Sequence, residues 1–210
     1  MDRPETAKIR LYVEHPLGEG QSVRLDRAQA HYLFGVMRLG VGGRVALFDG
    51  KNGGWVSEVE AVGKRDGVLR VAEQCQPQKN PPDVWLLFAP VKKARTDFIV
   101  EKAVEMGVAR LQPVQTDYTN SGRIQRDRLQ ATAVEAAEQC GATYVPEVAE
   151  MARLASVLDR LPSERRLMFC DEAAVRAPLD GAPGPWAVLI GPEGGFSPAE
   201  RARLTDLPQS

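Results

Sequence analysis

The chain has 210 residues, of which 43% are hydrophobic, and its 27 Lys and Arg residues nearly balance 28 Asp and Glu residues, for a net charge of −1. This length and hydrophobic content predict a globular protein with one large domain or two modest ones. Because the net charge is close to zero, the overall charge gives no support for a nucleic-acid partner, and any RNA site must be a local patch.

The sequence contains no recognisable export or membrane signal. The first ten residues lack an apolar stretch of signal-peptide length, and no later segment reaches the roughly 20 apolar residues of a membrane span. Cys75, Cys140 and Cys170 are widely spaced and form neither a CxxC nor a CxxH pair, which argues against a disulfide framework or a metal site. We therefore expect a soluble cytoplasmic protein without a metal and without a membrane partner.

Short apolar or alternating runs, separated by turn signals, fill residues 1–75 and predict a small β domain. The strands are expected at residues 9–13, 21–25, 44–48, 55–62 and 68–71. The segment Asp49–Gly54 (DGKNGG) is expected to form a hairpin loop, because Gly and Asn tolerate the positive φ of tight turns. One helix is expected from Asp26, which can cap it, to about Leu39, just before Gly40.

A proline-containing segment separates this domain from the next. Residues 76–82 (QPQKNPP) hold three prolines and no large apolar side chain, so they are expected to be a linker. Residues 83–210 then alternate apolar runs with helical stretches, beginning with Val84–Val91, which is apolar on both faces like a buried parallel strand. Further strands are expected near 111–114, 167–170 and 186–190, and helices at 97–106, 126–140 and 151–161. This alternation predicts an α/β domain.

The most informative segment is Ala187–Glu200 (AVLIGPEGGFSPAE), an apolar strand, a glycine-rich turn and the beginning of a helix. Ser197 is expected to cap this helix, with Pro198 at its first position and Glu200 three residues after the cap, which together form a capping box. Ligands of open α/β folds bind at strand ends of this kind.

The glycines of this turn are compatible with a ligand-binding site but do not identify the ligand. Gly191, Gly194 and Gly195 have no Cβ, so the backbone can bend sharply and approach a ligand closely. Neither a Walker loop nor a GxGxxG fingerprint is present, and Glu193 disfavours a bound polyphosphate. From these residues alone, a ligand site and a tight strand-to-helix turn without a ligand remain equal alternatives.

Other segments resolve this ambiguity. GPEGGFSPAE resembles the knot-forming loop of the SPOUT methyltransferases, and specifically that of the ribosomal RNA small subunit methyltransferase E family, which methylates N3 of a uridine in 16S ribosomal RNA. Further segments that resemble the same family, in the same order, are His31–Arg38, Leu47–Gly50, Lys92–Arg95, Phe98–Gly107, Ala136–Gly141 and Pro146. The resemblance covers essentially the whole chain.

The resemblance implies a fold class, a reaction and a set of partners. The fold would be α/β, with an N-terminal PUA-like β-barrel and a SPOUT α/β knot domain that dimerises. The reaction would be S-adenosylmethionine-dependent methylation of uridine N3, in small-subunit ribosomal RNA within an assembled 30S particle, with no DNA partner. The residues expected to bind S-adenosylmethionine are Phe169, Cys170, Glu172, Leu189, Ile190, Gly191, Pro192, Glu193, Gly194 and Gly195.

Two features depart from the family pattern. After the GPEGG helix the family continues through a further strand into a Leu-Gly-Pro-Arg-Ile-Leu-Arg-x-x-Thr-Ala segment, which threads the knot and covers the adenosine, whereas this sequence stops at Ser210. We therefore expect the knot and the cofactor pocket of this chain to be incomplete. Ala142 stands where relatives often carry Arg, which weakens the case for a basic site there.

Cations are the candidate RNA contacts: Arg10, His31, Arg38, Lys92, Lys93, Arg95, Arg123 and Arg126. Lys92, Lys93 and Arg95 can hold phosphates or simply lie on a solvated loop. His31 and Arg38 are seven residues apart, and on the expected helix they would share a face.

The remaining candidates concern the core and the proton acceptor. Phe98, Met106 and Leu129 are expected in the core. No catalytic residue is assigned, because the second domain has no histidine and Glu172 and Glu193 are only candidate bases, Glu193 being expected mainly to cap its loop. The alternative functions are a non-catalytic RNA-binding protein with a degenerate cofactor site and a nucleotide-dependent α/β enzyme.

Overall fold

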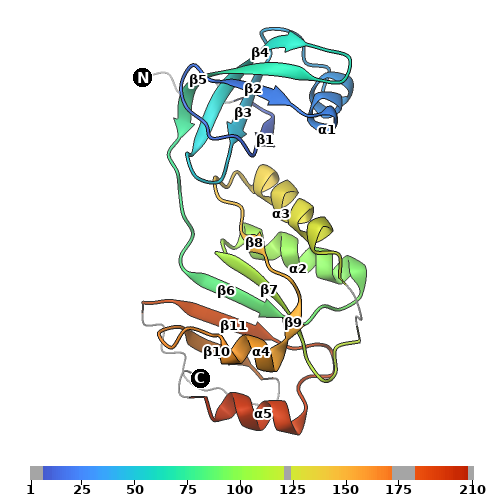
Figure 1. Cartoon of the computed structure of the whole chain (residues 1–210), viewed down its shortest axis with the longest axis vertical. Helices are drawn as coiled ribbons and strands as arrows, with labels where there is room; N and C mark the ends of the chain where they lie inside the picture. The colour runs from blue at the N-terminus through green and yellow to red at the C-terminus, as the bar shows by residue number, and fades with distance from the viewer. Residues whose placement is uncertain (1–6, 121–123, 172–182, 208–210) are drawn as a thin grey trace. The chain divides into compact units, whose positions relative to one another are not determined.

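The computed structural model describes residues 7–120, 124–171 and 183–207. The chain divides into two compact units (Figure 1). Unit 1 contains Met1–Asn80 and Ala137–Tyr144, and unit 2 contains Pro81–Ala136 and Val145–Ser210. The return of residues 137–144 to unit 1 has no counterpart in the sequence-based boundaries. None of the helices in the described ranges is long and apolar enough to cross a membrane.

Unit 1 is built on a five-stranded mixed sheet in the order β1-β3-β4-β5-β2. Its strands are β1 (Arg10–Tyr12), β2 (Ser22–Leu25), β3 (Arg44–Phe48), β4 (Gly54–Val62) and β5 (Gly67–Gln76). β1 pairs in parallel with β3, and the other pairs are antiparallel. Three register shifts between β4 and β5 mark irregularities of the bulge type, which bend and twist a strand pair. One core fills the unit, with Val23, Leu33, Leu47, Val59 and Leu69 among its members.

The helix of unit 1 differs from the sequence-based expectation. A short α-helix, α1 (Arg27–Ala30), begins at the predicted cap Asp26 and passes into a π-helix, η1 (His31–Val36), in which Met37 N donates to Tyr32 O over 2.9 Å. The chain then leaves the helix at Arg38, whose φ is +57°. The prediction that His31 and Arg38 share one face of an α-helix is therefore wrong, because the wider π turn rotates later residues and Arg38 lies beyond it.

The predicted hairpin loop between β3 and β4 is confirmed, and the Asp49 carboxylate organises it. Oδ1 accepts from the backbone N–H groups of Lys51 (2.9 Å) and Asn52 (2.7 Å), and Oδ2 accepts from Leu17 N (3.0 Å) and Asn52 Nδ2 (2.6 Å). Burial by itself would raise the pKa of Asp49, but the hydrogen bonds from Asn52, Lys51 and Leu17 lower it below its ordinary value. The charged carboxylate is therefore the form that the loop stabilises.

We predict that Asp49→Asn lowers the free energy of unfolding by about 1–3 kcal/mol, because an amide would place an N–H against backbone donors. The folded-state pKa of Asp49 is depressed, so its contribution is present above the ordinary value of 3.8 and is lost as the pH falls through the folded-state pKa. Urea unfolding should show a constant difference between wild type and variant above about pH 5 that shrinks below about pH 4. A difference independent of pH would contradict this role.

Unit 2 is an α/β domain with parallel strand pairing throughout its described residues, as the alternating pattern predicted. The sheet order is β10-β11-β6-β7-β8, with β9 paired to β7. The strands are β6 (Val84–Phe88), β7 (Arg110–Gln115), β8 (Glu147–Val148), β9 (Ala152–Arg153), β10 (Arg166–Cys170) and β11 (Trp186–Ile190). The helices are α2 (Lys93–Glu105), α3 (Arg126–Cys140), α4 (Leu154–Asp159) and α5 (Pro198–Thr205).

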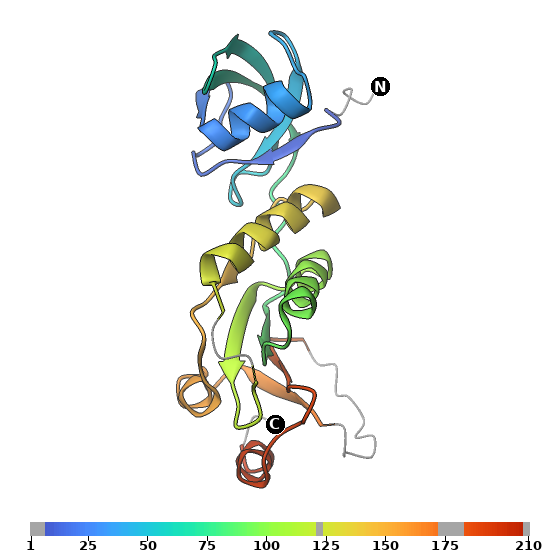
Figure 2. The same cartoon turned by 90° about the vertical axis from the view of Figure 1, so that its right-hand side faces the viewer.

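Helices cover the sheet of unit 2 on both faces. Leu154 of α4 and Leu204 of α5 pack in one cluster with Leu87 and Leu189, from the central strands. Figure 2 shows α2 on the opposite side of the strands from α4. Parallel strands buried on both faces explain the nearly continuous apolar runs that the sequence shows at these positions.

The core predictions for the helices are partly wrong. Leu129 is fully buried, as expected, but Phe98 is 57% exposed and Met106 is 83% exposed. α2 buries Thr96 and Val100, and Phe98 lies two residues from each, which places it on the opposite side of the helix at about 100° per residue. Met106 is the C-cap residue, beyond the last full turn.

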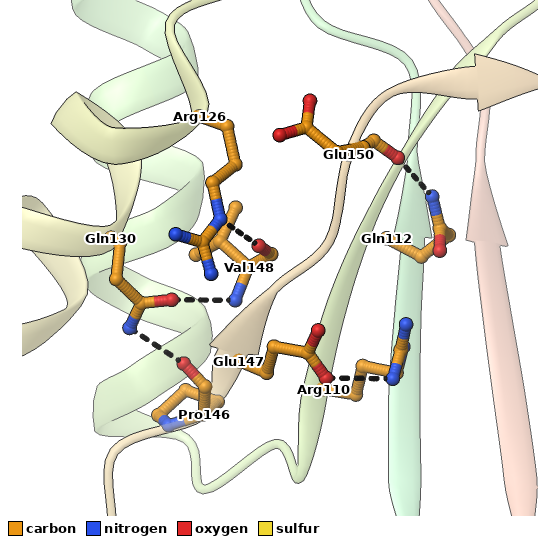
Figure 3. Close-up of polar contacts among 8 residues, drawn as sticks. All are labelled: Arg110, Gln112, Arg126, Gln130, Pro146, Glu147, Val148 and Glu150. Carbon is orange, nitrogen blue, oxygen red and sulfur yellow. Dashed lines mark hydrogen bonds and ion pairs between the residues drawn. The ribbon is translucent and has the colours of Figure 1, made fainter.

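Side chains from α3 fix the short strand β8 at the sheet edge (Figure 3). Gln130 Nε2 donates to Pro146 O over 3.1 Å, and its Oε1 accepts from Val148 N over 2.9 Å. Arg126 Nε donates to Val148 O over 2.9 Å. These bonds satisfy backbone groups on the side of β8 that faces away from β7, so α3 completes the pairing of an edge strand.

Candidate functional site

The loops that follow β6, β10 and β11 meet at one edge of the sheet. The parallel register pairs Cys170 with Ile190 and Ile190 with Phe88, so the three strands end side by side. Ala89 N also donates to Ile190 O over 3.0 Å, which continues the pairing past β6. This carboxyl edge is where open α/β sheets form their ligand sites.

The GPEGG turn folds back on itself at this edge. Gly195 N donates to Pro192 O over 2.9 Å, and Gly195 has a φ of +69°. A Cβ at Gly191 would lie 2.6 Å from the Phe196 ring, closer than real side chains approach. Phe196 in turn packs edge-on against Phe169, with 4.9 Å between ring centroids. Gly191 is therefore required for the ring to close over the end of β11.

The predicted capping box at the start of α5 is confirmed. Ser197 Oγ accepts from Glu200 N over 3.2 Å, and Glu200 Oε2 accepts from Ser197 N over 3.0 Å. The same two side chains also contact the loop after β7, because Ser197 Oγ donates to Asp117 Oδ2 over 2.5 Å and Asp117 N donates to Glu200 Oε1 over 2.9 Å. We call these three residues the Asp117 clamp, which ties the GPEGG turn to the loop after β7.

The first cavity at this edge, the β10–β11 cavity, has a volume of about 160 Å³. Its lining residues are Cys170, Asp171, Ile190, Gly191, Pro192, Gly195, Phe196 and Arg201. The Arg201 guanidinium pairs with the Asp171 carboxylate, whose side chain is only 13% exposed. Burial raises the pKa of the Cys170 thiol, so this sulfur is protonated and not a nucleophile near neutral pH.

The second cavity, the β6–β7 cavity, has a volume of about 360 Å³. Its lining residues are Pro90, Val91, Lys92, Lys93, Tyr118, Asn120, Pro192, Glu193 and Gly194. Pro192 lines both cavities, so the GPEGG turn is a wall that they share. The β10–β11 cavity is lined by backbone and by a partly buried ion pair. The β6–β7 cavity is lined by two cations, one carboxylate and an aromatic ring.

Unit 1 carries a basic groove beside η1, with a volume of about 610 Å³. It is lined by Arg27, Ala28, Ala30, His31, Phe34, Gly35, Gly63, Lys64 and Arg65. Four of these residues are basic, and none of the described residues that line the groove is acidic. A Cβ at Gly67 would lie 2.4 Å from the Phe34 ring, so the ring rests directly on the Gly67 backbone. We call this feature the η1 groove.

The structure brings together half of the residues expected to bind a cofactor. Cys170, Ile190, Gly191, Pro192 and Gly195 line the β10–β11 cavity. The other expected residues have different places. Leu189 is fully buried in the core and Phe169 packs against the same core, while Glu193 and Gly194 line the β6–β7 cavity; Glu172 lies outside the described residues.

The candidate RNA residues are spread over both units. His31 lines the η1 groove, whereas Arg38 follows η1 in a left-handed backbone conformation. In unit 2, Lys92 and Lys93 line the β6–β7 cavity, and Arg95 is exposed in the first turn of α2. Arg123 lies outside the described residues.

Two of the candidate arginines are engaged inside their own unit. Arg10 is partly buried and donates to Ala142 O over 2.8 Å, and burial lowers its pKa. Arg126 donates to Val148 O and pairs with Asp127 at 3.1 Å. Both guanidinium groups therefore help to hold the fold together by binding backbone carbonyl oxygens, and the sequence does not predict these contacts.

Sequence reasoning missed several residues that line the cavities. Asp171 lies between the expected residues Cys170 and Glu172, and Phe196 lies within the segment Ala187–Glu200, but neither was among the residues expected to bind the cofactor. Arg201 lies in α5 and reaches a residue 30 positions earlier, and no local signal announces that contact. Tyr118 belongs to the loop after β7, which the sequence marks only as the end of an apolar run.

Known families match both parts of the chain. Residues 78–208 match the RNA methyltransferase domain family, and residues 25–71 match the RNA methyltransferase PUA domain family. The fold and the site thus define a two-part RNA-modifying protein, a PUA-like domain followed by a SPOUT-type α/β methyltransferase domain. The chain belongs to the RNA methyltransferase family.

Curated relatives are similar along most of the chain. Ribosomal RNA small subunit methyltransferase E of Rickettsia conorii is 24% identical over 196 residues, which are 90% of this chain and 79% of that protein. The protein of the same name from Synechocystis is 27% identical and covers 85% of this chain, which in turn spans 62% of that protein.

Solved structures give the same result for the fold. A putative methyltransferase of Legionella pneumophila, in complex with the cofactor SAM, has a TM-score of 0.82 at 27% identity and covers 94% of this chain and 84% of its own. The ribosomal RNA small subunit methyltransferase E of Neisseria gonorrhoeae, bound to S-adenosyl methionine, has a TM-score of 0.79 at 25% identity, over 94% of this chain and 85% of its own.

We predict that Gly191→Ala weakens ligand binding in the β10–β11 cavity by about tenfold or more, because the added methyl group displaces the Phe196 ring. Gly194→Ala is the matched control, since a Cβ there meets Tyr118 Cβ only at an ordinary 3.6 Å. Isothermal titration calorimetry with S-adenosylmethionine measures both variants of the full-length protein. Equal affinities for the two variants would show that the Gly191–Phe196 contact does not shape the cavity.

Proposed function

We propose that this protein is a cytoplasmic S-adenosylmethionine-dependent methyltransferase that modifies N3 of a uridine in 16S ribosomal RNA, within the assembled 30S particle. The observation that carries the proposal is the β10–β11 cavity, built by the GPEGG turn at the carboxyl edge of a parallel sheet. The likeness of the chain to relatives named for small-subunit ribosomal RNA methylation, over about nine-tenths of its length, supports the same reaction.

The residues of this cavity fit part of S-adenosylmethionine. Glycine-edged backbone can recognise an adenine and a ribose through N–H and C=O groups, without the cations that a polyphosphate needs. The cavity, at about 160 Å³, is smaller than the roughly 300 Å³ at which sites for whole ligands begin, so it suits one portion of the molecule. When bound, S-adenosylmethionine supplies an electrophilic methyl group on a sulfonium centre.

The protein residues would bind and orient this group. Gly191, Pro192 and Gly195 offer backbone at the cavity wall, and Ile190, which is 44% exposed, offers an apolar surface. We propose the Asp171–Arg201 pair as a positioning element, because it joins the end of β10 to α5 across the cavity. Holding the methyl donor in one orientation lowers the entropic part of the barrier to transfer.

RNA binding is proposed for two basic surfaces. In unit 1 the η1 groove combines Arg27, His31, Lys64 and Arg65 with the Phe34 ring, a set that can hold phosphates and stack one base. In unit 2, Lys92, Lys93 and Arg95 lie at the start of α2, where the helix dipole adds to their attraction for phosphate. These local patches reconcile an RNA partner with a net charge of −1.

We also propose that the protein forms a homodimer. Phe98 on α2 and Met106, the C-cap residue of α2, are exposed, large and apolar, and clusters of such side chains often mark interaction surfaces. α2 is a helix of unit 2, so a dimer of this kind would join the α/β domains.

We predict that the full-length protein transfers a labelled methyl group from S-adenosylmethionine to 30S particles that lack the modification, and that nuclease digestion and mass spectrometry locate the label as N3-methyluridine. Sedimentation of the same preparation should give a dimer. Label on another base, or RNA binding without any S-adenosylmethionine binding, would contradict the proposal; the second result would favour a non-catalytic RNA-binding protein.

The η1 groove has its own test. We predict that Lys64→Ala with Arg65→Ala weakens binding to 30S particles about tenfold and lowers the slope of log affinity against log salt by about 2, because two phosphate contacts are lost. The control is Arg44→Ala with Arg70→Ala, which also removes two charges of unit 1 but from pairs with Glu73 and Glu60 outside the groove. Equal losses for both double variants would refute a specific groove.

A further inference from the structure

We propose that the β6–β7 cavity receives the uracil ring of the target nucleotide, and that the Glu193 carboxylate accepts the proton of its N3. This inference rests on the proposed function, and it adds a site for the target uridine to the proposed site for S-adenosylmethionine. The GPEGG turn would then border both substrates, with the methyl donor beside Gly191 and the methyl acceptor beside Glu193.

The position of the cavity is the first argument. Pro192 lines both cavities, so the two cavities adjoin at this residue and ligands in them can meet beside it. Transfer of a methyl group requires the accepting nitrogen and the methyl carbon to come into direct contact in one geometry, which only adjoining sites can provide. The basic groove of unit 1 has no such shared wall and suits the RNA backbone.

The walls of the cavity are held in a fixed relation. Tyr118 follows Asp117, whose backbone N–H and carboxylate are both bound by the first turn of α5. On the other side, Gly194 lies against Tyr118, since a Cβ there would be 3.6 Å from Tyr118 Cβ. The Asp117 clamp thus sets the distance between the tyrosine and the GPEGG turn. Tyr118 is 44% exposed, which leaves part of its side chain available for stacking by a base.

The charges that line the cavity match the edge of uracil. Its Watson–Crick edge presents an acceptor, a donor and an acceptor, which are O2, N3–H and O4. The cavity contains one carboxylate, Glu193, and two ammonium groups, Lys92 and Lys93, so a carboxylate can take the N3 proton while cations meet the oxygens. Cytosine presents no proton at N3 and carries an amino group in place of O4, so it would set a donor against a cation.

The same charges assist the chemical step. The N3 proton passes to the Glu193 carboxylate, and the negative charge left on N3, O2 and O4 is stabilised by Lys92 and Lys93 at the start of α2. The N3 electron pair then forms a bond to the methyl carbon as the bond between that carbon and sulfur breaks, with its electrons remaining on sulfur. The products are N3-methyluridine, a neutral thioether and a protonated carboxyl group that releases its proton to water.

The test compares Glu193→Gln with wild type in the full-length protein. We expect methyl transfer to 30S particles to fall by about 100-fold or more, while the affinities for S-adenosylmethionine and for 30S particles change by less than about twofold. The remaining rate of the variant should rise steeply with pH, because uridine must then lose its proton to solvent, whereas the wild-type rate should be flatter. Glu101→Gln, which changes an exposed carboxylate paired with Lys102, is the matched control.

Tyr118 provides a second, independent readout. Tyr118→Ala should raise KM for 30S particles and leave S-adenosylmethionine affinity unchanged, and Tyr118→Phe should restore most of the loss, because the ring and not the hydroxyl stacks. Full activity in both Glu193→Gln and Tyr118→Ala would overturn the inference, as would a loss of S-adenosylmethionine affinity in Glu193→Gln. Failure of wild type to methylate 30S particles would instead overturn the proposed function.

Discussion

The missing side chain at Gly191 is the constraint on which the site in unit 2 depends. Because no Cβ occupies this position, the Phe196 ring can close over the end of β11 and pack against Phe169. That closure turns the chain back, so that α5 begins at Ser197 beside the loop after β7. A larger residue would have to displace an aromatic ring from a core made of both strands and helices.

The capping box of α5 has two uses in this fold. Ser197 and Glu200 satisfy the first backbone groups of the helix, as such boxes do in general, and both also bind Asp117. The capping box therefore also makes a long-range contact, since Ser197 and Asp117 are 80 residues apart in the sequence. These bonds hold the end of the GPEGG turn in place, and a site that must orient two reactants needs walls held in this way.

The charges that could attract RNA lie in local patches and do not show in the net charge of the protein. The net charge of −1 carries no information about an RNA partner, yet the η1 groove gathers four basic residues without an acidic one among its described lining. Several other surface cations are paired with near neighbours, as Arg44 and Arg70 are with Glu73 and Glu60. Cations that remain beside a groove or a helix start are therefore the ones that can attract phosphate.

The sequence by itself determined those features that a few neighbouring residues control. The Asp49 hairpin, the Ser197–Glu200 capping box and the strongly apolar strands of the α/β domain could all be predicted, because turn chemistry, capping and burial leave short-range patterns. The same patterns, together with the order of the segments, were sufficient to indicate the family. They were not sufficient for the helix of unit 1, since a π turn after Ala30 has no sequence signal of comparable strength.

Only the tertiary structure decided which side chains meet. Arg10 and Arg126 look like surface cations in the sequence but bind backbone carbonyls, and Phe98 looks like core but lies on the exposed side of α2. Arg201 reaches Asp171, and Glu193 lines a different cavity from Gly191 although only Pro192 lies between them in the sequence. Each of these outcomes depends on strand register and helix rotation, which are set by packing across the whole sheet and not by the adjoining residues.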